Sequence, residues 1–349
     1  MCKPNFEKIV KCCTYILFLF IFCGCQDKNA DAINVIPLKD ALELSNSEEI
    51  LLSKYASEID YIALAADSSV MLPGPESLKL RAVGDDILLC REMMSSKSPA
   101  CFRFSSDGVF LNGIGTTGNG PGEYARLMND ISLSVHQKEQ IDVFDGGKLI
   151  TFDLEGNCIS EKRKSEFTDE EREIYTIGKN KPNIYSYYKI PSITNVGSDT
   201  VRSINGEVRY IFDFGNYSAT LPKDRKVMLR ASTYAETDRF ILFETLYFFK
   251  AFPNLSKRQM VCEMVYDKIT GKTTAIKTEE SLPLDGFTND LDNGVPFWPS
   301  LTTQNKMYQL VDAITFIDWA GQFNSPKMKA VAAQLTEESN PVLIVVTLK

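Results

Sequence analysis

Short strand-like runs separated by turns recur along this chain at a nearly constant spacing. The motif Phe104-x-x-x-Gly108 recurs 48 residues later as Phe152-x-x-x-Gly156, and the turn at Gly206 lies 50 residues further on. Repeats of about 40 to 50 residues, each holding four short strands, are typical of β-propeller blades. The 325 residues that follow the first 24 would supply six blades of about 54 residues each. The sequence therefore predicts an all-β fold, a six-bladed β-propeller with a few short helical insertions.

Alternation of apolar and polar residues with a period of two identifies the individual strands. The predicted strands are 78–83, 87–90, 100–104, 131–135, 141–144, 149–153, 208–214, 239–246, 261–267, 273–277 and 341–348. Helical signals are limited to 168–177, which begins with a capping box, and to 326–335. A propeller must join its last blade to its first, and the β-prone runs 341–348 and 33–38 are the candidates for this closure. The propeller domain is expected to span residues 33–349.

A glycine-rich stretch from Gly113 to Tyr124 connects two predicted blades and carries five glycines in twelve residues. Its Gly-x-Gly-x-x-Gly spacing matches a dinucleotide-binding motif, but that motif requires a helix to begin at the third glycine. Pro121 and the glycines around it prevent such a helix. We therefore interpret this stretch as a structural connector. Its residues are Gly115, Gly118, Gly120, Pro121, Gly122, Glu123 and Tyr124.

A tight turn is expected within this connector. Pro121 and Gly122 suit the two central positions of a type II turn, which would place Gly122 at a positive φ. Glu123 follows the turn and is expected to cap amide groups of the connector rather than to act as an acid.

The N-terminus has the features of a secretion signal. Three lysines within the first eleven residues precede an apolar run, Tyr15 to Phe22, which is too short to span a bilayer. The sequence Phe22-Cys23-Gly24-Cys25 resembles a bacterial lipobox, and this resemblance implies that residues 1–24 are removed and Cys25 carries a lipid anchor. Residues 25–32 would then form a tether to the membrane. The alternatives are an ordinary cleaved signal peptide and an uncleaved anchor.

Charge and cysteine content restrict the possible partners. The chain has a net charge of −8, and removal of residues 1–24, which carry three lysines and one glutamate, changes this to −10. An acidic chain without a basic block argues against nucleic acid and against anionic membranes as partners. The cysteines after Cys25 are Cys90, Cys101, Cys158 and Cys262, with no Cys-x-x-Cys pair that would suggest a zinc or redox site. Cys90 and Cys101 either form a disulfide or remain buried free thiols.

Three segments together resemble a known family. These are the run Phe104 to Leu111, the box from Gly115 to Tyr124, and the run Glu338 to Leu343 near the C-terminus. They are similar to six-bladed β-propeller lipoproteins of Bacteroides-type bacteria, and the resemblance covers nearly the whole mature chain. It implies a fold distantly related to NHL-repeat propellers and a location in the cell envelope, as an outer-membrane lipoprotein. It implies no particular reaction, because a fold alone does not define a function.

Few residues have the character of catalytic groups. His136 is the only histidine, and no Gly-x-Ser-x-Gly motif is present, which argues against a Ser-His-Asp triad and against histidine-based zinc sites. Asp290 and Asp292 lie in an acidic loop that could supply oxygen ligands to a divalent cation such as calcium, although the loop lacks EF-hand spacing. Trp298 follows closely and could stack on a sugar or a peptide. Asp290, Asp292 and Trp298 are therefore the predicted ligand-binding residues.

Three classes of function remain open from the sequence. The preferred hypothesis is a lipid-anchored envelope propeller that binds a glycan, a peptide or an envelope protein where loops converge at one mouth of the ring. The second is a divalent-metal-dependent hydrolase or lyase with an axial active site. The third is a structural subunit of an envelope complex. No contact with nucleic acid is expected under any of them.

Overall fold

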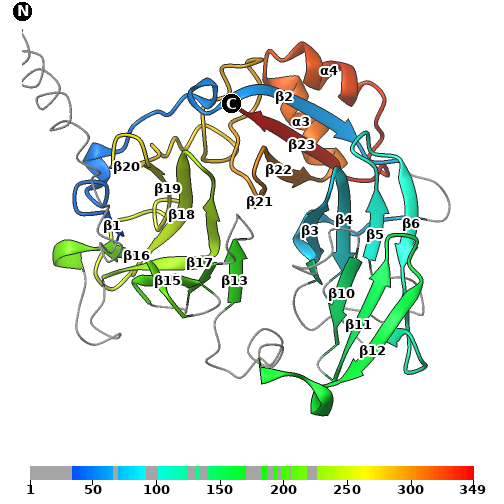
Figure 1. Ribbon diagram of the computed structural model, residues 1–349. Helices are drawn as coiled ribbons and strands as arrows, with labels where there is room; N and C mark the ends of the chain where they lie inside the picture. The colour runs from blue at the N-terminus through cyan, green and yellow to red at the C-terminus, as the bar shows by residue number, and fades with distance from the viewer. Residues whose placement is uncertain are drawn as a thin grey trace, which may run out of the picture. The chain divides into compact units, whose positions relative to one another are not determined.

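Antiparallel sheets of four or five strands make up most of the described chain (Figure 1). The computed structural model describes residues 34–65, 70–91, 101–124, 131–133, 140–145, 147–169, 183–186, 192–194, 198–203, 206–217 and 226–349. Residues 35–349 form one compact unit. Cys25, His136 and nearly all of the predicted helix 168–177 lie outside the described residues.

Five such sheets occur within the described residues, and each is named here by its strands. Sheet β3–β6 contains β3 (Leu78–Val83), β4 (Asp86–Arg91), β5 (Cys101–Phe104) and β6 (Phe110–Ile114). Sheet β9–β12 contains β9 (Ile131–Leu133), β10 (Gln140–Phe144), β11 (Lys148–Asp153) and β12 (Cys158–Arg163). Sheet β13–β16 contains β13 (Asn183–Ser186), β14 (Ser192–Thr194), β15 (Thr200–Ser203) and β16 (Val208–Asp213), with β1 (Asn34–Pro37) beside β16.

The remaining two sheets come from the C-terminal part of the chain and from one N-terminal strand. Sheet β17–β20 contains β17 (Val227–Glu236), β18 (Phe240–Tyr247), β19 (Val261–Asp267) and β20 (Lys272–Ala275). Sheet β21–β23 contains β21 (Leu301–Thr302), β22 (Lys306–Val311) and β23 (Val342–Leu348), with β2 (Ala56–Ala63) beside β23. The predicted strands therefore coincide with observed ones, in most cases to within two residues.

Apolar side chains fill the spaces between successive sheets. Leu242 of β18 and Ile344 of β23 belong to one buried cluster, which joins sheets β17–β20 and β21–β23. Phe212 of β16 packs edge-on against Phe243 of β18, with ring centroids 4.8 Å apart, in a cluster that joins sheets β13–β16 and β17–β20. Two further clusters join sheet β3–β6 to sheet β9–β12 and to sheet β21–β23. Burial of these faces explains why central strands such as β18 are apolar on both sides.

The C-terminal strand is held by partners from both ends of the chain. β23 pairs with β22 on one side and with β2 on the other, where Ile59 lies opposite Val346 and Tyr61 opposite Ile344 (Figure 1). The prediction that residues 341–348 take part in closure is thus confirmed. The early run 33–38 was the wrong partner, because β1 joins β16 of another sheet.

The actual partner, β2, is hard to recognise in the sequence. As the outer strand of its sheet it buries only one face, and Ser57, Glu58 and Asp60 interrupt its apolar residues. Its register on β23 also contains an irregularity between Ala56 and Glu58. The mixed pattern reflects this outer position.

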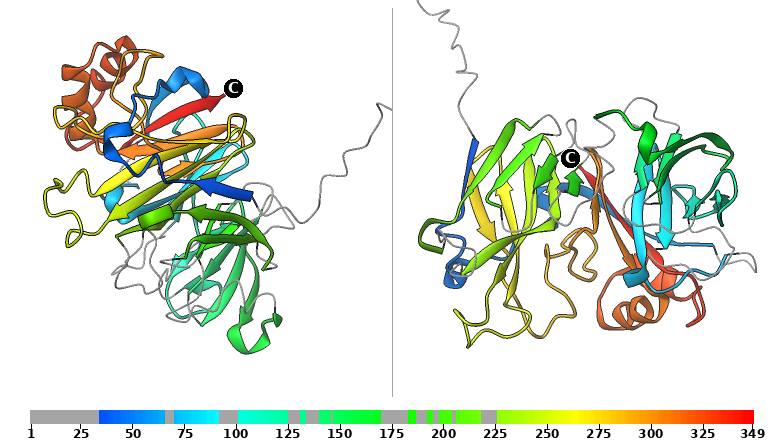
Figure 2. Two further views of the ribbon diagram at one scale, coloured as in Figure 1. Left: turned by 90° about the vertical axis from the view of Figure 1, so that its left-hand side faces the viewer. Right: turned by 90° about the horizontal axis from the view of Figure 1, so that it is seen from below.

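The N-terminal segment runs along three sheets in succession. After β1 it forms a 3-10 helix, η1 (Leu44–Asn46), and Glu48 then makes a parallel bridge to Ile276 just beyond β20. Leu51 makes a second parallel bridge to Thr288, and a further 3-10 helix, η2 (Leu52–Lys54), leads into β2. We call residues 34–63 the N-terminal strap, visible as the blue segment beside the green and red strands (Figure 2). The strap connects sheets β13–β16, β17–β20 and β21–β23 by backbone hydrogen bonds.

The repeated turn of the sequence adopts the same backbone conformation in three sheets. Gly108, Gly156 and Gly206 have φ values of 85°, 87° and 85°, which glycine adopts without steric cost. Each glycine amide donates to the carbonyl three residues earlier, at 3.0 to 3.1 Å. The side chain of that earlier residue, Ser105, Asp153 or Ser203, accepts a hydrogen bond from the amide after the glycine. These turns join the third and fourth strands of their sheets.

Two of these turns also touch the neighbouring sheet. A Cβ atom on Gly156 would lie 2.4 Å from the carbonyl oxygen of Gly113 in β6, and one on Gly108 would lie 2.7 Å from that of Ala63 in β2. Neither distance is compatible with a side chain. The glycines therefore permit the turns to pack directly on backbone of the adjacent sheet.

The glycine-rich connector forms a short parallel pair, β7 (Thr116–Thr117) and β8 (Glu123–Tyr124). Gly122 has a φ of 70°, the positive value that the sequence predicts, and the amide of Glu123 donates to the carbonyl of Gly120 across the turn. Glu123 Oε2 accepts a hydrogen bond from the Gly120 amide at 2.8 Å. The carboxylate also occupies the space that a Cβ atom on Gly118 would need.

The aromatic end of the connector is buried. Tyr124 donates through its hydroxyl to the carbonyl of Ile114 at 2.7 Å, and a Cβ atom on Gly115 would lie 2.9 Å from its ring. The connector thus acts in the described structure as a rigid join between sheets β3–β6 and β9–β12.

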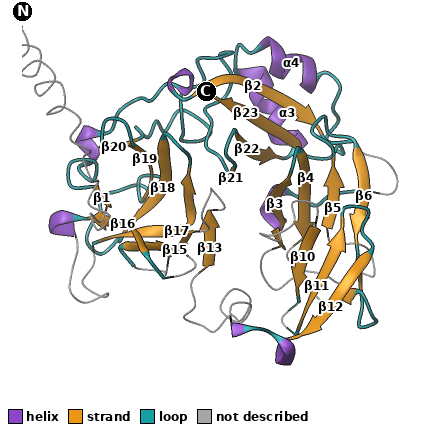
Figure 3. Cartoon of the chain, viewed as in Figure 1, coloured by secondary structure: helices purple, strands orange, loops and turns teal. Residues whose placement is uncertain are grey.

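Two α-helices lie beside β2 (Figure 3). Helix α4 (Pro326–Ala332) is capped by Ser325 and falls within the predicted helix 326–335. Helix α3 (Ala313–Gln322) is capped by Asp312 and was not predicted, although Ala313, Phe316 and Ala320 bury one face at helical spacing. Among the described residues, none of the helices is long and apolar enough to cross a membrane.

The close approach of Gly156 to β6 gives a testable consequence. We expect Gly156→Ala to lower the free energy of unfolding by clearly more than Gly206→Ala, which serves as its control. Both substitutions place alanine at the same positive φ, at a cost of about 1 to 2 kcal/mol. Only Gly156→Ala adds a clash, because a Cβ atom on Gly206 would meet nothing within 4 Å. Urea unfolding of both variants measures the difference, and equal losses would show that the contact with β6 is unimportant.

Candidate functional site

The longest described segment without strands or helices connects β20 to β21. It spans residues 276–300, which we call the β20–β21 loop, and its only internal bridge joins Phe287 to Phe297. Gly286 permits this approach, since a Cβ atom there would lie 2.4 Å from the Phe297 carbonyl oxygen. The strap bridges at Ile276 and Thr288 hold the loop from the other side. This loop contains all three predicted ligand-binding residues.

Asp290 connects the loop to the strap. Its Oδ1 accepts a hydrogen bond from the Ser53 amide at 2.9 Å, and its Oδ2 accepts one from the Ser53 hydroxyl. Ser53 belongs to η2. In the structure the Asp290 carboxylate therefore fixes the loop against the segment that leads into β2.

Asp292 connects the loop to β2 and to helix α4. Its Oδ1 accepts hydrogen bonds from the Tyr61 hydroxyl at 3.1 Å and from the Asn289 amide group at 2.7 Å. Its Oδ2 accepts one from the hydroxyl of Ser325, the residue that caps α4. Burial, followed by the Asp292 charge, raises the pKa of Tyr61 far above its usual value. The Asp292 carboxylate is thus surrounded by donors.

Trp298 lies against sheet β17–β20 and shares no hydrogen-bond partner with the two aspartates. Its indole Nε1 donates to Glu244 Oε1 at 3.1 Å, and its ring packs on Phe287 with centroids 5.7 Å apart. The structure places all three predicted residues in one loop but directs their polar atoms to different internal partners. Their role as ligand contacts remains a prediction.

Calcium does not fit the described environment of these aspartates. Each carboxylate faces hydroxyl or amide donors, whereas a calcium ion needs six to eight oxygen acceptors around it. Among the described residues, no group of three or more His, Cys, Asp or Glu side chains is arranged to hold a metal ion. The described cysteines, Cys90, Cys101, Cys158 and Cys262, are free thiols, and all but Cys158 are buried.

A row of charged residues crosses sheet β17–β20 next to the loop. Arg230, Glu244 and Glu263 lie directly opposite one another on β17, β18 and β19. Arg230 Nη1 donates to Glu244 Oε2 at 2.6 Å, while Glu244 Oε1 accepts from Trp298. Burial raises the pKa of Glu244, and the charge of Arg230 opposes this shift. The row therefore places two carboxyl groups side by side with one arginine.

Within this row, the Glu263 carboxyl has the fewest interactions to offset its burial. Within the described residues its Oε2 atom is buried and has no hydrogen-bond partner. Burial raises the pKa of Glu263 to about 7, and the nearby Glu244 and Asp285 carboxylates act in the same direction. Arg258 opposes the shift, but it is engaged by Asp285 through two hydrogen bonds of 2.9 Å. Close to neutral pH, Glu263 is therefore partly protonated.

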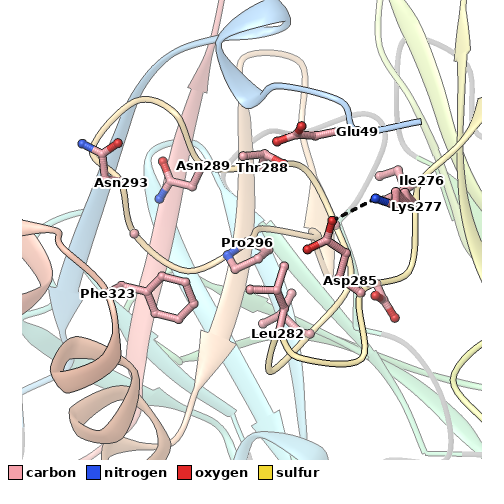
Figure 4. Close-up of a pocket in the computed structure, with 14 residues that line it drawn as sticks. Glu49, Ile276, Lys277, Leu282, Asp285, Thr288, Asn289, Asn293, Pro296 and Phe323 are labelled. Atoms are coloured by element: carbon pink, nitrogen blue, oxygen red, sulfur yellow. Dashed lines mark hydrogen bonds and ion pairs between the residues drawn. The ribbon is translucent and has the colours of Figure 1, made fainter. Parts of the chain in front are cut away.

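A cavity of about 270 Å³ opens in the β20–β21 loop. Glu49 and Thr288 lie above it in the close-up, and Phe323 and Leu282 lie below (Figure 4). The polar lining consists of Glu49, Lys277, Glu279, Asp285, Thr288, Asn289 and Asn293, and the apolar lining of Ile276, Leu282, Leu284, Pro296 and Phe323. We call this cavity the loop pocket. It combines hydrogen-bonding groups on one side with an apolar surface on the other.

The charge of the loop pocket is negative. Lys277 forms an ion pair with Glu279 at 3.3 Å, and Arg258 neutralises Asp285 from outside the cavity. Glu49 is exposed at the mouth, and in the described part of the chain it has no ion-pair partner. Acidic surroundings of this kind repel phosphates and favour neutral or cationic ligands.

Conformational strain also occurs at the pocket. Asn293 has a φ of 58° and is the only residue other than glycine with a positive φ among the described ones. Asparagine tolerates this conformation better than most residues, and such outliers are common at functional sites.

Neither the charged row nor most of the pocket lining was predicted from the sequence. One signal was present for Glu244, which interrupts the otherwise apolar run Phe240–Tyr247. A charged residue at the centre of a buried strand must have a partner, and it therefore indicates a polar site. No comparable signal exists for Glu49 or Phe323, because only the folded chain brings them to the loop.

Comparison with known proteins now assigns the fold. Residues 26–169 match the model of a protein family described as a 6-bladed beta-propeller. This chain is a six-bladed β-propeller. The number of blades follows from the description of the matching family model, while the described residues of the propeller contain five sheets with four or five strands.

Solved structures resemble the propeller over most of its length. One is a protein from Bacteroides fragilis NCTC 9343 whose description proposes that it is exported. It has 16% sequence identity and a TM-score of 0.63, and the match covers 90% of this chain and 100% of that chain. Another is a member of the duf4221 family from Bacteroides vulgatus ATCC 8482, with 10% identity, a TM-score of 0.43, and coverage of 87% and 98%. A search of curated proteins finds no match to the chain.

These findings confirm part of the family resemblance seen in the sequence. The likeness to a propeller family of Bacteroides-type bacteria is confirmed. The lipid anchor, the outer-membrane location and the relation to NHL repeats stay predictions. At 16% identity the B. fragilis structure supports the fold alone and leaves the ligand open.

The raised pKa of Glu263 predicts a specific pH dependence of stability. Its folded pKa of about 7 lies above the ordinary value of 4.5. Below pH 4.5 the Glu263 carboxyl is protonated in both the folded and the unfolded state, so it costs no stability. Between pH 4.5 and 7 the unfolded state ionises first, so the stability falls as the pH rises, by about 3 kcal/mol in total.

Glu263→Gln should remove this loss. We expect the variant to match the parent protein near pH 4 and to exceed its free energy of unfolding progressively up to pH 7. Urea unfolding at several pH values measures the effect, and Glu155→Gln in an exposed turn is the control. A difference that does not change with pH would contradict the assignment of a raised pKa to Glu263.

Proposed function

We propose that this propeller is an exported, lipid-anchored protein of the cell envelope that binds a small neutral glycan in the loop pocket. The signal-like N-terminus with Cys25 supports export and anchoring. The description of the B. fragilis neighbour as a protein proposed to be exported agrees with this location. The observation that carries the binding function is the loop pocket itself.

The lining of the loop pocket matches the surface of a sugar. Carboxylate and amide oxygens of Glu49, Asp285 and Asn293 can accept hydrogen bonds from hydroxyl groups, and amide nitrogen can donate to ring oxygens. The ring of Phe323 offers an apolar surface to the C–H face of a pyranose. Such a combination of an apolar wall with a few placed polar groups is typical of small-ligand sites.

The predicted residues Asp290, Asp292 and Trp298 do not line the loop pocket, but they hold in place the loop that forms it. Asp290 and Asp292 fix the loop to the strap and to α4, and Trp298 fixes it to sheet β17–β20. In this proposal their hydrogen bonds keep the pocket preorganised, which lowers the entropic cost of binding. Ligand contacts then fall to Asp285 and Asn293 of the same loop, to Glu49 of the strap and to Phe323 at the end of α3.

Of the three functional hypotheses, the binding module is the one that a described feature supports directly. A divalent-metal-dependent hydrolase or lyase would have to show chelator-sensitive turnover of a bound substrate. A structural subunit of an envelope complex would co-purify with a partner protein in a fixed ratio. A peptide with a basic side chain is the other ligand that the negative pocket could accept.

A thermal-shift experiment tests the glycan site. Maltose, cellobiose and chitobiose are the neutral probes, oligolysine is the cationic probe and pyrophosphate is the polyanionic probe. We expect at least one neutral disaccharide to raise the melting midpoint, because a ligand that binds only the native state stabilises it. Glu49→Gln combined with Phe323→Leu should reduce the shift at least fivefold, while Glu155→Gln in a distant turn should leave it intact.

Two results would exclude the loop pocket as the glycan site, and a third would change the class of ligand. A shift with pyrophosphate alone, or a disaccharide shift that survives the double substitution, would exclude the loop pocket as the glycan site. A shift with oligolysine alone that the double substitution abolishes would replace the glycan by a basic peptide.

The anchor is tested separately. We expect Cys25→Ser to prevent incorporation of a labelled fatty acid and to leave the protein either soluble or uncleaved, because the proposed lipid bond forms on the Cys25 thiol. Radiolabelled palmitate in growing cells, followed by fractionation, measures this. Cys158→Ser, which removes an exposed thiol elsewhere, is the matched control. Continued labelling of the Cys25 variant would contradict the anchor.

A further inference from the structure

A second cavity lies beside the N-terminal part of the strap. It has a volume of about 370 Å³ and is lined by residues from the strap, from the 3-10 helix η5 (Gly215–Tyr217), and from the segments before β17 and after β18. We call it the strap pocket. Its size lies within the range of about 300 to 1,000 Å³ that is usual for small-ligand sites. The strap pocket and the loop pocket share no lining residue.

One wall of the strap pocket is aromatic and rigid. The rings of Tyr217 and Phe252 are stacked, with centroids 6.1 Å apart and an angle of 21° between their planes. Phe252 also packs edge-on against the buried ring of Tyr247 at 5.1 Å. The Tyr217 hydroxyl donates to Glu43 at 2.6 Å. Burial, followed by this hydrogen bond, raises the pKa of Tyr217 to about 12, so the wall stays uncharged at neutral pH.

The charge of the strap pocket is opposite to that of the loop pocket. Lys39 and Lys226 both line it, and within the described chain neither ammonium group forms an ion pair. The only acidic side chain in the lining, Glu43, is occupied by the Tyr217 hydroxyl. Two lysines with one engaged carboxylate give a local excess of positive charge on a chain whose net charge is −8.

The backbone around both lysines is fixed. The Lys226 carbonyl accepts a hydrogen bond from the Phe248 amide at 2.9 Å, and the Lys39 stem lies close to Gly215, where a Cβ atom would approach it to 3.4 Å. Both lysines therefore line a cavity with an aromatic wall from backbone segments that are held in place. Lysine stems and aromatic rings together suit a ligand that is apolar on one face and anionic at one end.

We propose that the strap pocket binds an acidic monosaccharide, a sugar ring that carries a carboxylate. The carboxylate lies between the Lys39 and Lys226 ammonium groups, as charge-assisted hydrogen bonding favours. The C–H face of the ring packs against Tyr217 and Phe252, and the Asn216 amide is available to the hydroxyl groups. This site is independent of the glycan site in the loop pocket, and either one can exist without the other.

Ligand-observed NMR with the mature protein tests the proposal, with glucuronate, methyl glucoside and inorganic phosphate as probes. We expect glucuronate to bind at least tenfold more tightly than either of the other two, because only glucuronate combines the ring with the carboxylate. Lys39→Gln combined with Lys226→Gln should weaken glucuronate binding by about 10-fold, as expected for two partly exposed ion pairs. Phe252→Leu should weaken it as well.

The control is Lys257→Gln, which removes the same charge from an exposed site outside the pocket, and it should leave the affinity unchanged. Melting midpoints of all variants establish that they are folded. Equal binding of phosphate and glucuronate, equal binding of methyl glucoside and glucuronate, or binding that is insensitive to the two lysines would each overturn the proposal. None of these results tests the glycan site, because none of the substituted residues lines the loop pocket.

Discussion

The pairing of β2 with β23 is the interaction on which the rest of the structure depends. Seven positions of β23 lie opposite residues of β2, although the two strands come from opposite ends of the chain. Ile59 and Tyr61 of β2 are buried in the same cluster as Ile344 and Val346 of β23. Without this pairing, β23 would expose an apolar edge and the strap would lose its C-terminal attachment. Closure, the strap and the β20–β21 loop therefore form one connected system.

The loop pocket and the strap pocket are consequences of this system. The strap lines both cavities, contributing Glu49 to one and Lys39 to the other. Asp290 and Asp292 attach the loop to the strap, to β2 and to α4, so the geometry of the loop pocket depends on closure. The charged row on sheet β17–β20 imposes a cost, since one buried oxygen of Glu263 has no hydrogen-bond partner among the residues that the structure describes. Titratable groups with perturbed pKa values, such as Glu263, cluster at functional sites.

Much of the fold was predictable because its signals are local. Period-two runs identified strands such as β3 and β19 with their observed bounds, and the positive φ of Gly122 followed from the Pro-Gly pair. β2 was missed because an outer strand buries one face only, and α3 was missed because its buried face is narrow. The loop was identified, but the sequence could not show that Asp290 and Asp292 would be bonded to the strap and to α4. Those partners lie more than 30 residues away along the chain.

Native-state hydrogen exchange tests the central claim, that β2–β23 closure is part of the cooperative core. If closure is coupled to the whole fold, the hydrogen-bonded amides of β2 and β23 exchange only through global unfolding, with the same free energy as those of β18. The outer strand β12, which is largely exposed, should exchange through local opening at a lower free energy. Exchange of β2 and β23 at the level of β12, while β18 stays protected, would show that the ring opens without unfolding and would contradict the account.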